Sequence, residues 1–262
     1  MGIIDEITIV GSGNVARHLA KTFIVSGIAI NKVISRNIKN ASMLGNEIGV
    51  AASDNLKDIP KNSKLVLLCV SDGALEKLAP YIRSMNFQVA HTAGSVPLSV
   101  FGDDKRNTGV FYPFQTFTKN VREGDVKFPL CIEAGSEEML ESLKKLANMV
   151  SDSVVVMNSE QRKQLHISGI VANNFSNFIF GRAFEYLNSK KIDSKLLIPL
   201  IEETVQKIRL QNPDTLQTGP AVRRSNNIIE EHIEYLKGNN DLKELYSFLS
   251  KSIMSFHERK NE

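Results

Sequence analysis

The sequence predicts an α/β protein in which a doubly wound, mostly parallel sheet is followed by an all-helical C-terminal domain. Strand-like and helix-like stretches alternate as far as Val150, a pattern typical of a parallel sheet with crossover helices. From Ser159 onward apolar residues recur only with helical spacing, and no convincing strand remains. We therefore expect residues 1–157 to form the sheet domain and residues 158–262 to form the helical domain.

A glycine-rich turn joins the first strand to the first helix. The apolar residues 7–10 lead into Gly-Ser-Gly-Asn-Val-Ala at residues 11–16, the G-x-G-x-x-A form of the dinucleotide-binding turn. Gly11 permits a sharp turn, Gly13 lets a pyrophosphate approach the backbone, and Ala16 keeps the helix close to the sheet. The same pattern occurs in ordinary glycine-rich loops, but its place between a strand and a helix that stops at Gly27 favours a cofactor site. We assign to this site Gly11, Ser12, Gly13, Asn14 and Val15.

The second strand indicates which dinucleotide is bound. NAD requires an Asp or Glu on the ribose about 20 residues beyond the glycines, whereas the 2′-phosphate of NADP requires an Arg. Residues 30–34 end in Ser35-Arg36-Asn37, and no acidic residue occurs between Glu6 and Glu47. Arg36 can bind a phosphate, Ser35 and Asn37 can add hydrogen bonds, and Lys39 adds positive charge. NADP(H) is therefore the expected cofactor, although Arg36 could also be a solvated residue of a surface turn.

The other elements follow from apolar patterning. Residues 65–70 are apolar throughout, which indicates a strand buried on both faces. We expect further strands at residues 50–52, 88–90, 109–111, 129–133 and 154–157, and helices at residues 40–48 and 137–149. In the helical domain we expect helices at residues 159–187, 194–210, 226–237 and 241–257, with Ser159 as the N-cap of the first.

Polar residues stand at the carboxyl ends of three of these strands, where open α/β sheets bind ligands. The ends read Ser-Asp-Gly at residues 71–73, His-Thr-Ala-Gly-Ser at residues 91–95 and Tyr-Pro-Phe-Gln-Thr at residues 112–116. We expect them to line a cleft beside the nicotinamide. The cofactor would be contacted by Val70, Ser71 and Asp72, and the substrate by Ser95, Tyr112 and Gln115.

Three of these assignments have structural alternatives. Asp72 and Gly73 could form a simple turn. His91 is either a catalytic proton donor or a hydrogen-bonded histidine of a polar loop. Ser95 could bind a substrate carboxylate or cap the segment that follows it.

The long helix from Ser159 supplies further candidates. His166, Asn173, Asn174 and Asn177 share one face of a helix otherwise rich in apolar residues. Buried polar groups need hydrogen-bond partners, and a substrate is one such partner. We assign proton transfer to His166, orientation of a carbonyl or imine to Asn174, and substrate contact to Asn173. The same residues could instead bind the sheet domain or a second subunit.

Residues 218–225 form a second polar cluster between helices. Its Gly-Pro turn carries Arg223 and Arg224, and an arginine can clamp an acidic substrate or a phosphate. We assign Arg223 to substrate binding, with a solvated interhelical loop as the alternative. No cluster of Cys, His and carboxylate residues has the spacing of a metal site, so we expect no bound metal.

Taken together, the motifs resemble those of NADP-dependent reductases that join an N-terminal Rossmann domain to an all-helical C-terminal domain. This group contains pyrroline-5-carboxylate reductase, prephenate dehydrogenase, ketopantoate reductase and deazaflavin-dependent NADP reductases. The resemblance covers nearly the whole chain and is closest to a branch of Rossmann-like oxidoreductases with its own C-terminal domain of unknown function. It rests on residues 11–16, 91–95, 112–117, 166–174 and 219–223.

The resemblance implies hydride transfer from NADPH, and two departures leave the proton donor open. Related keto-acid dehydrogenases commonly carry a lysine on the first long helix of the second domain. That face here carries His166, with Lys163 one turn earlier. Tyr112 stands before a proline where relatives look as if they carry histidine.

Composition excludes several other classes of protein. The chain has 262 residues, 42% hydrophobic and 23% charged, as a globular protein does, and its net charge of +3 is too small to indicate nucleic-acid binding. No apolar run approaches membrane-spanning length, and the first strand leaves no room for a signal peptide. Cys69 and Cys131 lie in apolar runs and are expected to be core residues. We therefore expect a cytoplasmic protein.

The sequence is compatible with two functions of different kinds. The first is an NADPH-dependent reductase of a small carbonyl or imine that carries a carboxylate. The second is a sensor that binds NADP without turnover, which the absence of a clear lysine donor favours. The phenylalanines of residues 175–184 indicate a helix buried on all sides, either in a homodimer, as the resemblance implies, or as the central helix of a monomer.

Overall fold

The computed structural model describes residues 4–119 and 128–261. The chain divides into two compact units, Met1–Ile170 and Val171–Glu262. The division between Ile170 and Val171 falls inside the long helical segment, whereas the sequence predicts the boundary at residue 157. Each unit is described below by itself.

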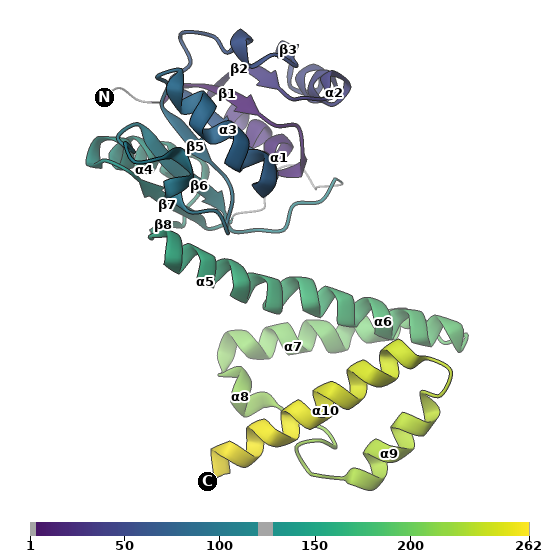
Figure 1. The fold of residues 1–262 in the computed structure, drawn as a ribbon. Coiled ribbons are helices and arrows are strands. Elements are labelled where there is room, and N and C mark those ends of the chain that lie inside the picture. Colours follow the sequence, from purple (N-terminus) through teal and green to yellow (C-terminus); the bar gives the residue numbers. More distant parts are fainter. Residues whose placement is uncertain (1–3, 120–127, 262) are drawn as a thin grey trace. The chain divides into compact units, whose positions relative to one another are not determined.

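The first unit is built on an eight-stranded sheet with the order β3-β2-β1-β4-β5-β6-β7-β8 (Figure 1). The strands are β1 (Glu6–Val10), β2 (Ala29–Ile34), β3 (Ala52–Ser53), β4 (Leu65–Leu68), β5 (Val89–His91), β6 (Thr108–Pro113), β7 (Leu130–Ala134) and β8 (Val154–Val156). Every neighbouring pair is parallel except β6 and β7. The doubly wound, mostly parallel sheet predicted from the sequence is confirmed.

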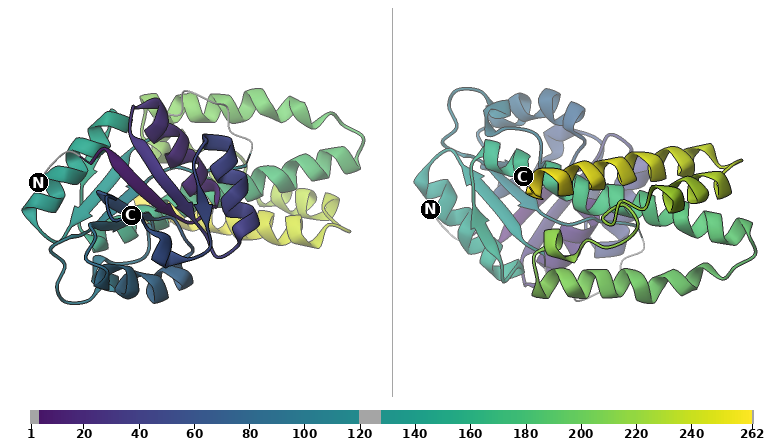
Figure 2. Two further views of the ribbon diagram at one scale, coloured as in Figure 1. Left: turned by 90° about the horizontal axis from the view of Figure 1, so that it is seen from above. Right: turned by 90° about the horizontal axis from the view of Figure 1, so that it is seen from below.

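Side chains alternate between the two faces of the sheet and build two cores. In β4, Leu65 and Leu67 belong to one core, and Val66 and Leu68 belong to the other. The first core is covered by α1 (Asn14–Val25), α2 (Ile38–Ile48) and α4 (Glu137–Val150), and the second by α3 (Asp72–Ser84) and the short 3₁₀ helix η2 (Leu98–Phe101). The left view of Figure 2 shows α1 and α4 on one side of the sheet and α3 on the other.

The sequence did not predict α3. Its start, Asp72-Gly73, looks like a turn, and Pro80 lies within it. The structure shows a helix because Leu75, Ala79 and Ile82 recur at helical spacing and are all buried against the sheet. Tertiary burial here outweighs the poor helix propensity of Gly and Pro.

Helix α5 (Ser159–Gly169) begins one residue earlier than predicted, so Ser159 is its first residue rather than its N-cap. The N-cap is Asn158, whose side chain accepts from the backbone N–H of Gln161, while the Gln161 side chain accepts from the N–H of Asn158. This reciprocal capping box replaces the expected Ser159 cap. The Ser159 hydroxyl is therefore available for contacts with the sheet.

The long helix predicted over residues 159–187 is continuous in extent but changes its winding. A π-helical section, η3 (Ile170–Phe175), joins α5 to α6 (Ser176–Ser189). The other helices are η4 (Ser194–Leu197), α7 (Ile198–Leu210), α8 (Pro213–Leu216), α9 (Asn226–Tyr235) and α10 (Asn240–Asn261). π-helical turns are rare and occur frequently at functional sites.

The second unit buries few of its own residues. Within its described part, the buried residues are Ala221, Ile229, Leu236 and Ser250. Helices α6 and α7 contain no buried residue at all. Across residues 4–119 and 128–261, no helix has both the length and the apolar character needed to cross a membrane.

Candidate active site

The glycine-rich turn between β1 and α1 has the geometry of a nucleotide cradle. Gly11 has φ +125°, and a Cβ there would lie 2.0 Å from the carbonyl oxygen of Cys69, so only glycine fits. Its N–H donates to the Ile34 carbonyl at 2.7 Å, which joins the carboxyl ends of β1 and β2. A Cβ at Gly13 would meet nothing within 4 Å, so the space beside the N-terminus of α1 is open. This space can admit a pyrophosphate.

The residues around this cradle fit an NADP molecule. The first turn of α1 carries no acidic side chain, so the positive end of the helix dipole is left for a phosphate. The Ser12 hydroxyl donates to the Ser35 hydroxyl at 2.9 Å and links the glycine loop to the end of β2. Arg36 is exposed and makes no ion pair with any described residue. A guanidinium free in this way can bind a 2′-phosphate.

The other predicted cofactor residues also have structural contacts. Asn37 is the N-cap of α2, and its side chain accepts from the N–H of Asn40 at 3.2 Å. The Asn14 amide donates to the Phe117 carbonyl at 3.0 Å. Val15 packs against the first core, and Val70 packs against the second. Their side chains are thus occupied, and the backbone remains the part that can face a nucleotide.

Strands β4, β5 and β6 lie side by side, so their carboxyl ends meet at one edge of the sheet as predicted. Ser71 is the N-cap of α3, and Asp72 is its first residue. The Ser95 hydroxyl donates to the Asp72 carboxylate. Ser95 therefore connects the ends of β4 and β5 in this structure.

The structure brings Tyr112 and His166 together at the same edge. The Tyr112 hydroxyl lies 3.0 Å from Nδ1 of His166, and the two rings meet edge to face with centroids 6.0 Å apart. Gly94 makes this possible, because a Cβ there would lie 2.7 Å from both His166 Nδ1 and Tyr112 Cζ. A strand end, a loop glycine and a helix thus converge on one hydrogen bond.

The protonation state of Tyr112 follows from its burial. Burial raises the pKa of the Tyr112 hydroxyl to about 12, so the phenol keeps its proton at neutral pH. A protonated phenol can donate this hydrogen bond to Nδ1, and a neutral imidazole that accepts it carries its own proton on Nε2. His166 in this form presents an N–H donor at Nε2.

His91 has the environment of a structural histidine. Its side chain is fully buried and stacks on Phe101, with ring centroids 5.7 Å apart. Its Nδ1 accepts from the N–H of Ala93 at 3.2 Å. Burial, and then the nearby positive charge of Arg162, lower the pKa of His91 to about 3. The imidazole is therefore neutral at physiological pH, and a role as proton donor is disfavoured.

A buried ion pair that the sequence did not reveal lies beside this site. Arg162 is 1% exposed and pairs with the carboxylate of Glu133, the penultimate residue of β7. Ser159 also donates to that carboxylate, at 2.8 Å and 2.9 Å from its two oxygens. The only sequence signal was an acidic residue at the end of an otherwise apolar strand, which is weak because strand ends are commonly polar.

The remaining candidates are exposed. The Gln115 side chain accepts from the backbone N–H of Thr116 at 2.8 Å. In the second unit, Asn173 and Asn174 lie on the π-helical section, where the Asn173 amide donates to the Asn174 side chain at 3.2 Å. Arg223 is exposed in the loop before α9, whereas its neighbour Arg224 pairs with Glu258 at 3.3 Å.

The two cysteines are buried in the first unit. Cys69 and Cys131 are buried free thiols, and burial raises the pKa of Cys69 to about 12 and that of Cys131 to about 11. Neither is a ready nucleophile. Within the described ranges, no group of three or more His, Cys, Asp or Glu side chains could hold a metal ion.

Two protein-family models match different parts of the chain, and the second match begins inside the first unit. Residues 6–89 match the model described as NADP oxidoreductase, coenzyme F420-dependent. Residues 128–253 match a domain of unknown function, DUF2520. A search of curated proteins finds no significant match.

Several solved structures of other proteins are similar to this chain over nearly its whole length. A Bacteroides fragilis protein assigned as an NADP oxidoreductase is 35% identical, with a TM-score of 0.88 over 96% of this chain and 98% of that one. Protein TM1727 of Thermotoga maritima is 22% identical, with a TM-score of 0.68 over 98% and 100%. An imine reductase from Myxococcus stipitatus in complex with NADP⁺ is 15% identical, with a TM-score of 0.63 over 95% and 93%. The last two likenesses show the fold alone.

Proposed function

This chain belongs to the family of NADP oxidoreductases that join an NADP-binding domain to a C-terminal DUF2520 domain, and we propose that it reduces a small carbonyl or imine that carries a carboxylate. It is an NADP-dependent oxidoreductase, so the open question is which substrate it reduces. Family membership favours this function over a sensor without turnover.

The observation that carries the proposal is the Tyr112–His166 hydrogen bond at the carboxyl edge of the sheet. When NADPH is bound, its nicotinamide supplies the hydride. Reduction of a carbonyl or imine also consumes a proton at the oxygen or nitrogen. We assign that proton to Nε2 of His166, with Tyr112 holding the imidazole in the tautomer that carries it.

The cofactor would be held by the cradle of the first unit. Backbone N–H groups after Gly13 and the N-terminus of α1 would bind the pyrophosphate, and Arg36 would bind the 2′-phosphate. Ser12 and Ser35, joined by their hydrogen bond, would hold the glycine loop and the end of β2 at a fixed separation. We also propose that Ser71 and Asp72 contact the cofactor near its ribose.

Asn173, Asn174 and Arg223 are second-unit candidates whose roles rest on the sequence. We propose that Asn174 orients the reacting group, that Asn173 contacts the substrate and that Arg223 binds its carboxylate. An amide that orients substrate affects kcat, whereas a carboxylate clamp mainly affects KM. Separate kinetic constants for Asn174→Ala and Arg223→Ala would therefore test these roles.

The test of the function is NADPH oxidation with a panel of 2-keto acids and cyclic imino acids. We expect turnover of at least one compound, and a fall in kcat of about 10²- to 10⁴-fold in His166→Gln, because general acid catalysis contributes this much. Tyr112→Phe should lower kcat less, since the imidazole remains. NADPH binding, measured by fluorescence titration, should be unchanged in both variants. Tight NADPH binding without turnover of any compound would reject the reductase and support the sensor.

We also propose that the protein acts as a homodimer through its second unit. Large apolar side chains on α6 and α7 are exposed. Because most of the stability of a helix in a protein comes from tertiary packing, these two helices need a surface to pack against. The exposed large apolar residues of the unit include Phe175, Phe178, Phe180, Leu196, Leu200, Val205, Ile208, Leu210 and Phe248. A second copy that covers these residues would complete the missing core.

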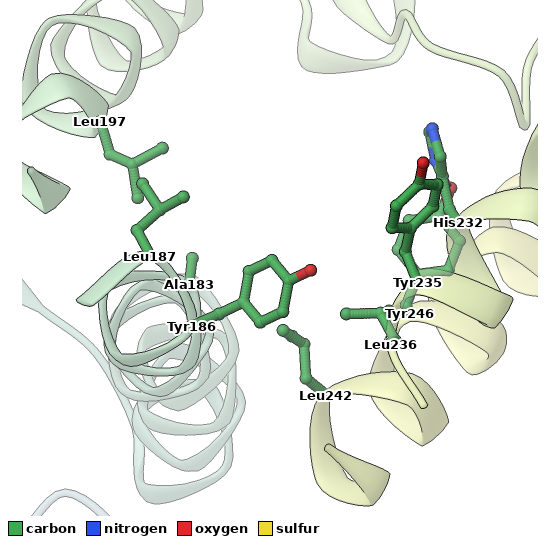
Figure 3. Close-up of a pocket in the computed structure, with 9 residues that line it drawn as sticks. All are labelled: Ala183, Tyr186, Leu187, Leu197, His232, Tyr235, Leu236, Leu242 and Tyr246. Atoms are coloured by element: carbon green, nitrogen blue, oxygen red, sulfur yellow. The ribbon is translucent and has the colours of Figure 1, made fainter. Parts of the chain in front are cut away.

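A cavity within the second unit gives further support. It has a volume of about 450 Å³ and separates α6 and η4 from α9 and α10. Figure 3 shows Tyr186 and Leu187 on one side of this space and Leu236, Leu242 and Tyr246 on the other. Protein interiors are normally close-packed, so an opening of this size between helices is consistent with a site for apolar side chains of a partner.

Light scattering coupled to gel filtration tests the dimer. We expect twice the mass of the 29.1 kDa chain. Phe178→Lys should shift the mass toward the monomer, because a charge in an apolar interface is costly. Val25→Lys, on an exposed residue of the first unit, is the matched control and should leave the mass unchanged. A monomeric mass for the unaltered protein would reject the proposal.

We further propose a cytoplasmic location, which the two buried free thiols support because thiols persist in reducing compartments. Fractionation of cells that express the protein, followed by immunodetection, tests this location. Recovery in an extracytoplasmic fraction would contradict it.

A further inference from the structure

The buried ion pair between Arg162 and Glu133 joins three parts of the first unit. One nitrogen of the Arg162 guanidinium pairs with the carboxylate of Glu133 in β7. The other donates to the Val96 carbonyl at 2.6 Å, in the loop that follows β5. Ser159 completes the group, since its hydroxyl donates to Glu133 and accepts from the N–H of Leu98 at 2.9 Å. The loop is thus held at two points by the first turns of α5.

This arrangement is expensive for a purely structural contact. Arg162 is 1% exposed, and the Glu133 side chain is 16% exposed. Taking two charges out of water costs several kcal/mol per ion, and packed apolar residues in their place are often no less stable. Stability alone therefore does not explain why charged residues stand here.

The position of the ion pair suggests what it does. Arg162 precedes His166 by one turn of α5, so both side chains lie on the same face of the helix. Val96 follows Gly94 by two residues, and Gly94 packs directly against His166 and Tyr112. The guanidinium consequently fixes both surfaces between which the imidazole sits: the helix that carries it and the loop that faces it.

We propose that Arg162 is a positioning residue, which, held by Glu133, sets the Tyr112–His166 hydrogen bond by fixing the Gly94–Leu98 loop against α5. The catalytic use of that hydrogen bond rests on the proposed function, but its geometry does not. The planar fork of an arginine is required, because one group must bind a carboxylate and a carbonyl at fixed angles. Positive charge from Arg162 also lowers the pKa of Tyr112, against the larger effect of burial.

Two variants separate positioning from folding. Arg162→Lys keeps the charge but loses the fork. The double variant Arg162→Met with Glu133→Met removes both charges together, so no unpaired ion is left in the interior. Arg106→Met is the matched control, because Arg106 is also paired with a carboxylate, Asp104, but lies on the surface of the same unit.

The first measurement needs no substrate. The protein has five histidines, so ¹⁵N-histidine NMR spectra are simple, and Tyr112→Phe identifies the His166 Nδ1 signal by removing its partner. We expect the signal of Arg162→Lys and of the double variant to move toward that of Tyr112→Phe, and the signal of Arg106→Met to stay in place. A folded double variant or Arg162→Lys variant with an unchanged His166 signal would overturn the proposal.

The second measurement is kinetic. With any substrate that the unaltered protein turns over, kcat should fall by roughly 10- to 100-fold in Arg162→Lys, as a small misplacement of a reacting group can cause. The Kd for NADPH should stay unchanged, because the cradle at Gly11 lies on other strands. An equal loss of NADPH binding and of kcat would indicate general unfolding and contradict positioning. If no substrate is found, the proposed function fails while the NMR result still decides this inference.

Discussion

Gly94 packs so closely against His166 that a Cβ at residue 94 would lie 2.7 Å from the imidazole Nδ1. The same Cβ would lie 2.7 Å from Cζ of Tyr112, so the glycine faces both partners of the hydrogen bond. The site therefore depends on the absence of one methyl group in the loop after β5.

Gly94→Ala should separate Tyr112 from His166. Distances below 3.0 Å to a Cβ force the ring atoms to shift, so we expect kcat to fall by about 10- to 100-fold. Gly73→Ala is the control, because a Cβ at Gly73 would meet nothing within 4 Å. Kinetic assays with NADPH in excess measure both. Equal kcat values for the two variants would show that the close packing at residue 94 is not needed for activity.

Arg36→Ala should weaken NADPH binding selectively. Loss of a charge-assisted contact with the 2′-phosphate predicts an increase in Kd of roughly 10- to 100-fold. NADH lacks that phosphate and serves as the internal control, so its Kd should change little. Calorimetric titration of both coenzymes measures the difference. A parallel weakening of NADH and NADPH would mean that Arg36 supports the fold rather than selects the phosphate.

His91 should make the first unit sensitive to acid. Its pKa in the folded state is lowered to about 3 from the usual histidine value of 6.5, so the unfolded chain takes up the proton first. The contribution to stability is present above pH 6.5 and is lost as the pH falls toward 3. The loss is at most about 5 kcal/mol, since each pKa unit corresponds to about 1.4 kcal/mol.

Denaturant titrations between pH 7 and pH 3 would measure this loss. His91→Gln should flatten the fall in the free energy of unfolding over that range. His232→Gln, on an exposed histidine of the second unit, should leave the fall as it is. An unchanged pH dependence in His91→Gln would show that other groups cause the acid sensitivity.

Glu133→Gln should be among the most destabilising single changes in the first unit. Removal of the carboxylate leaves the Arg162 guanidinium buried without its counter-ion, which costs about 3–5 kcal/mol. Glu141→Gln removes an exposed partner of Lys144 and should change stability little. Chemical denaturation of both variants compares them. A loss no larger than that of Glu141→Gln would mean that water reaches the Arg162 site.

Much of the first unit could be predicted from the sequence because its signals are local. The glycines of residues 11–16 and the apolar run of residues 65–70 specify a turn and a buried strand through their own chemistry. By contrast, α3 was missed because its Gly and Pro suppress the helical signal and its support comes from the sheet. The sequence also predicts Ser159 as the N-cap, because Asn158 and Ser159 are both good caps; only the tertiary contact of Ser159 with Glu133 distinguishes them.

The candidate site was only partly visible in the sequence. Tyr112 and His166 were singled out separately, one as a substrate contact and one as a proton donor, and the structure joins them across 54 residues of chain. Arg162 gave no signal, since its partners Glu133 and Val96 lie 29 and 66 residues away. His91 had two readings, and burial favours the structural one.

The sequence by itself determined the order of the strands, most of the helices, the glycine cradle and the preference for a phosphorylated dinucleotide, because each depends on residues that are neighbours in the chain. Tertiary structure alone decided which polar side chains are paired, which are buried and which keep their protons. Pairing, burial and protonation arise from contacts between distant segments and from the exclusion of water around those contacts. No single stretch of residues encodes either the contacts or the exclusion of water.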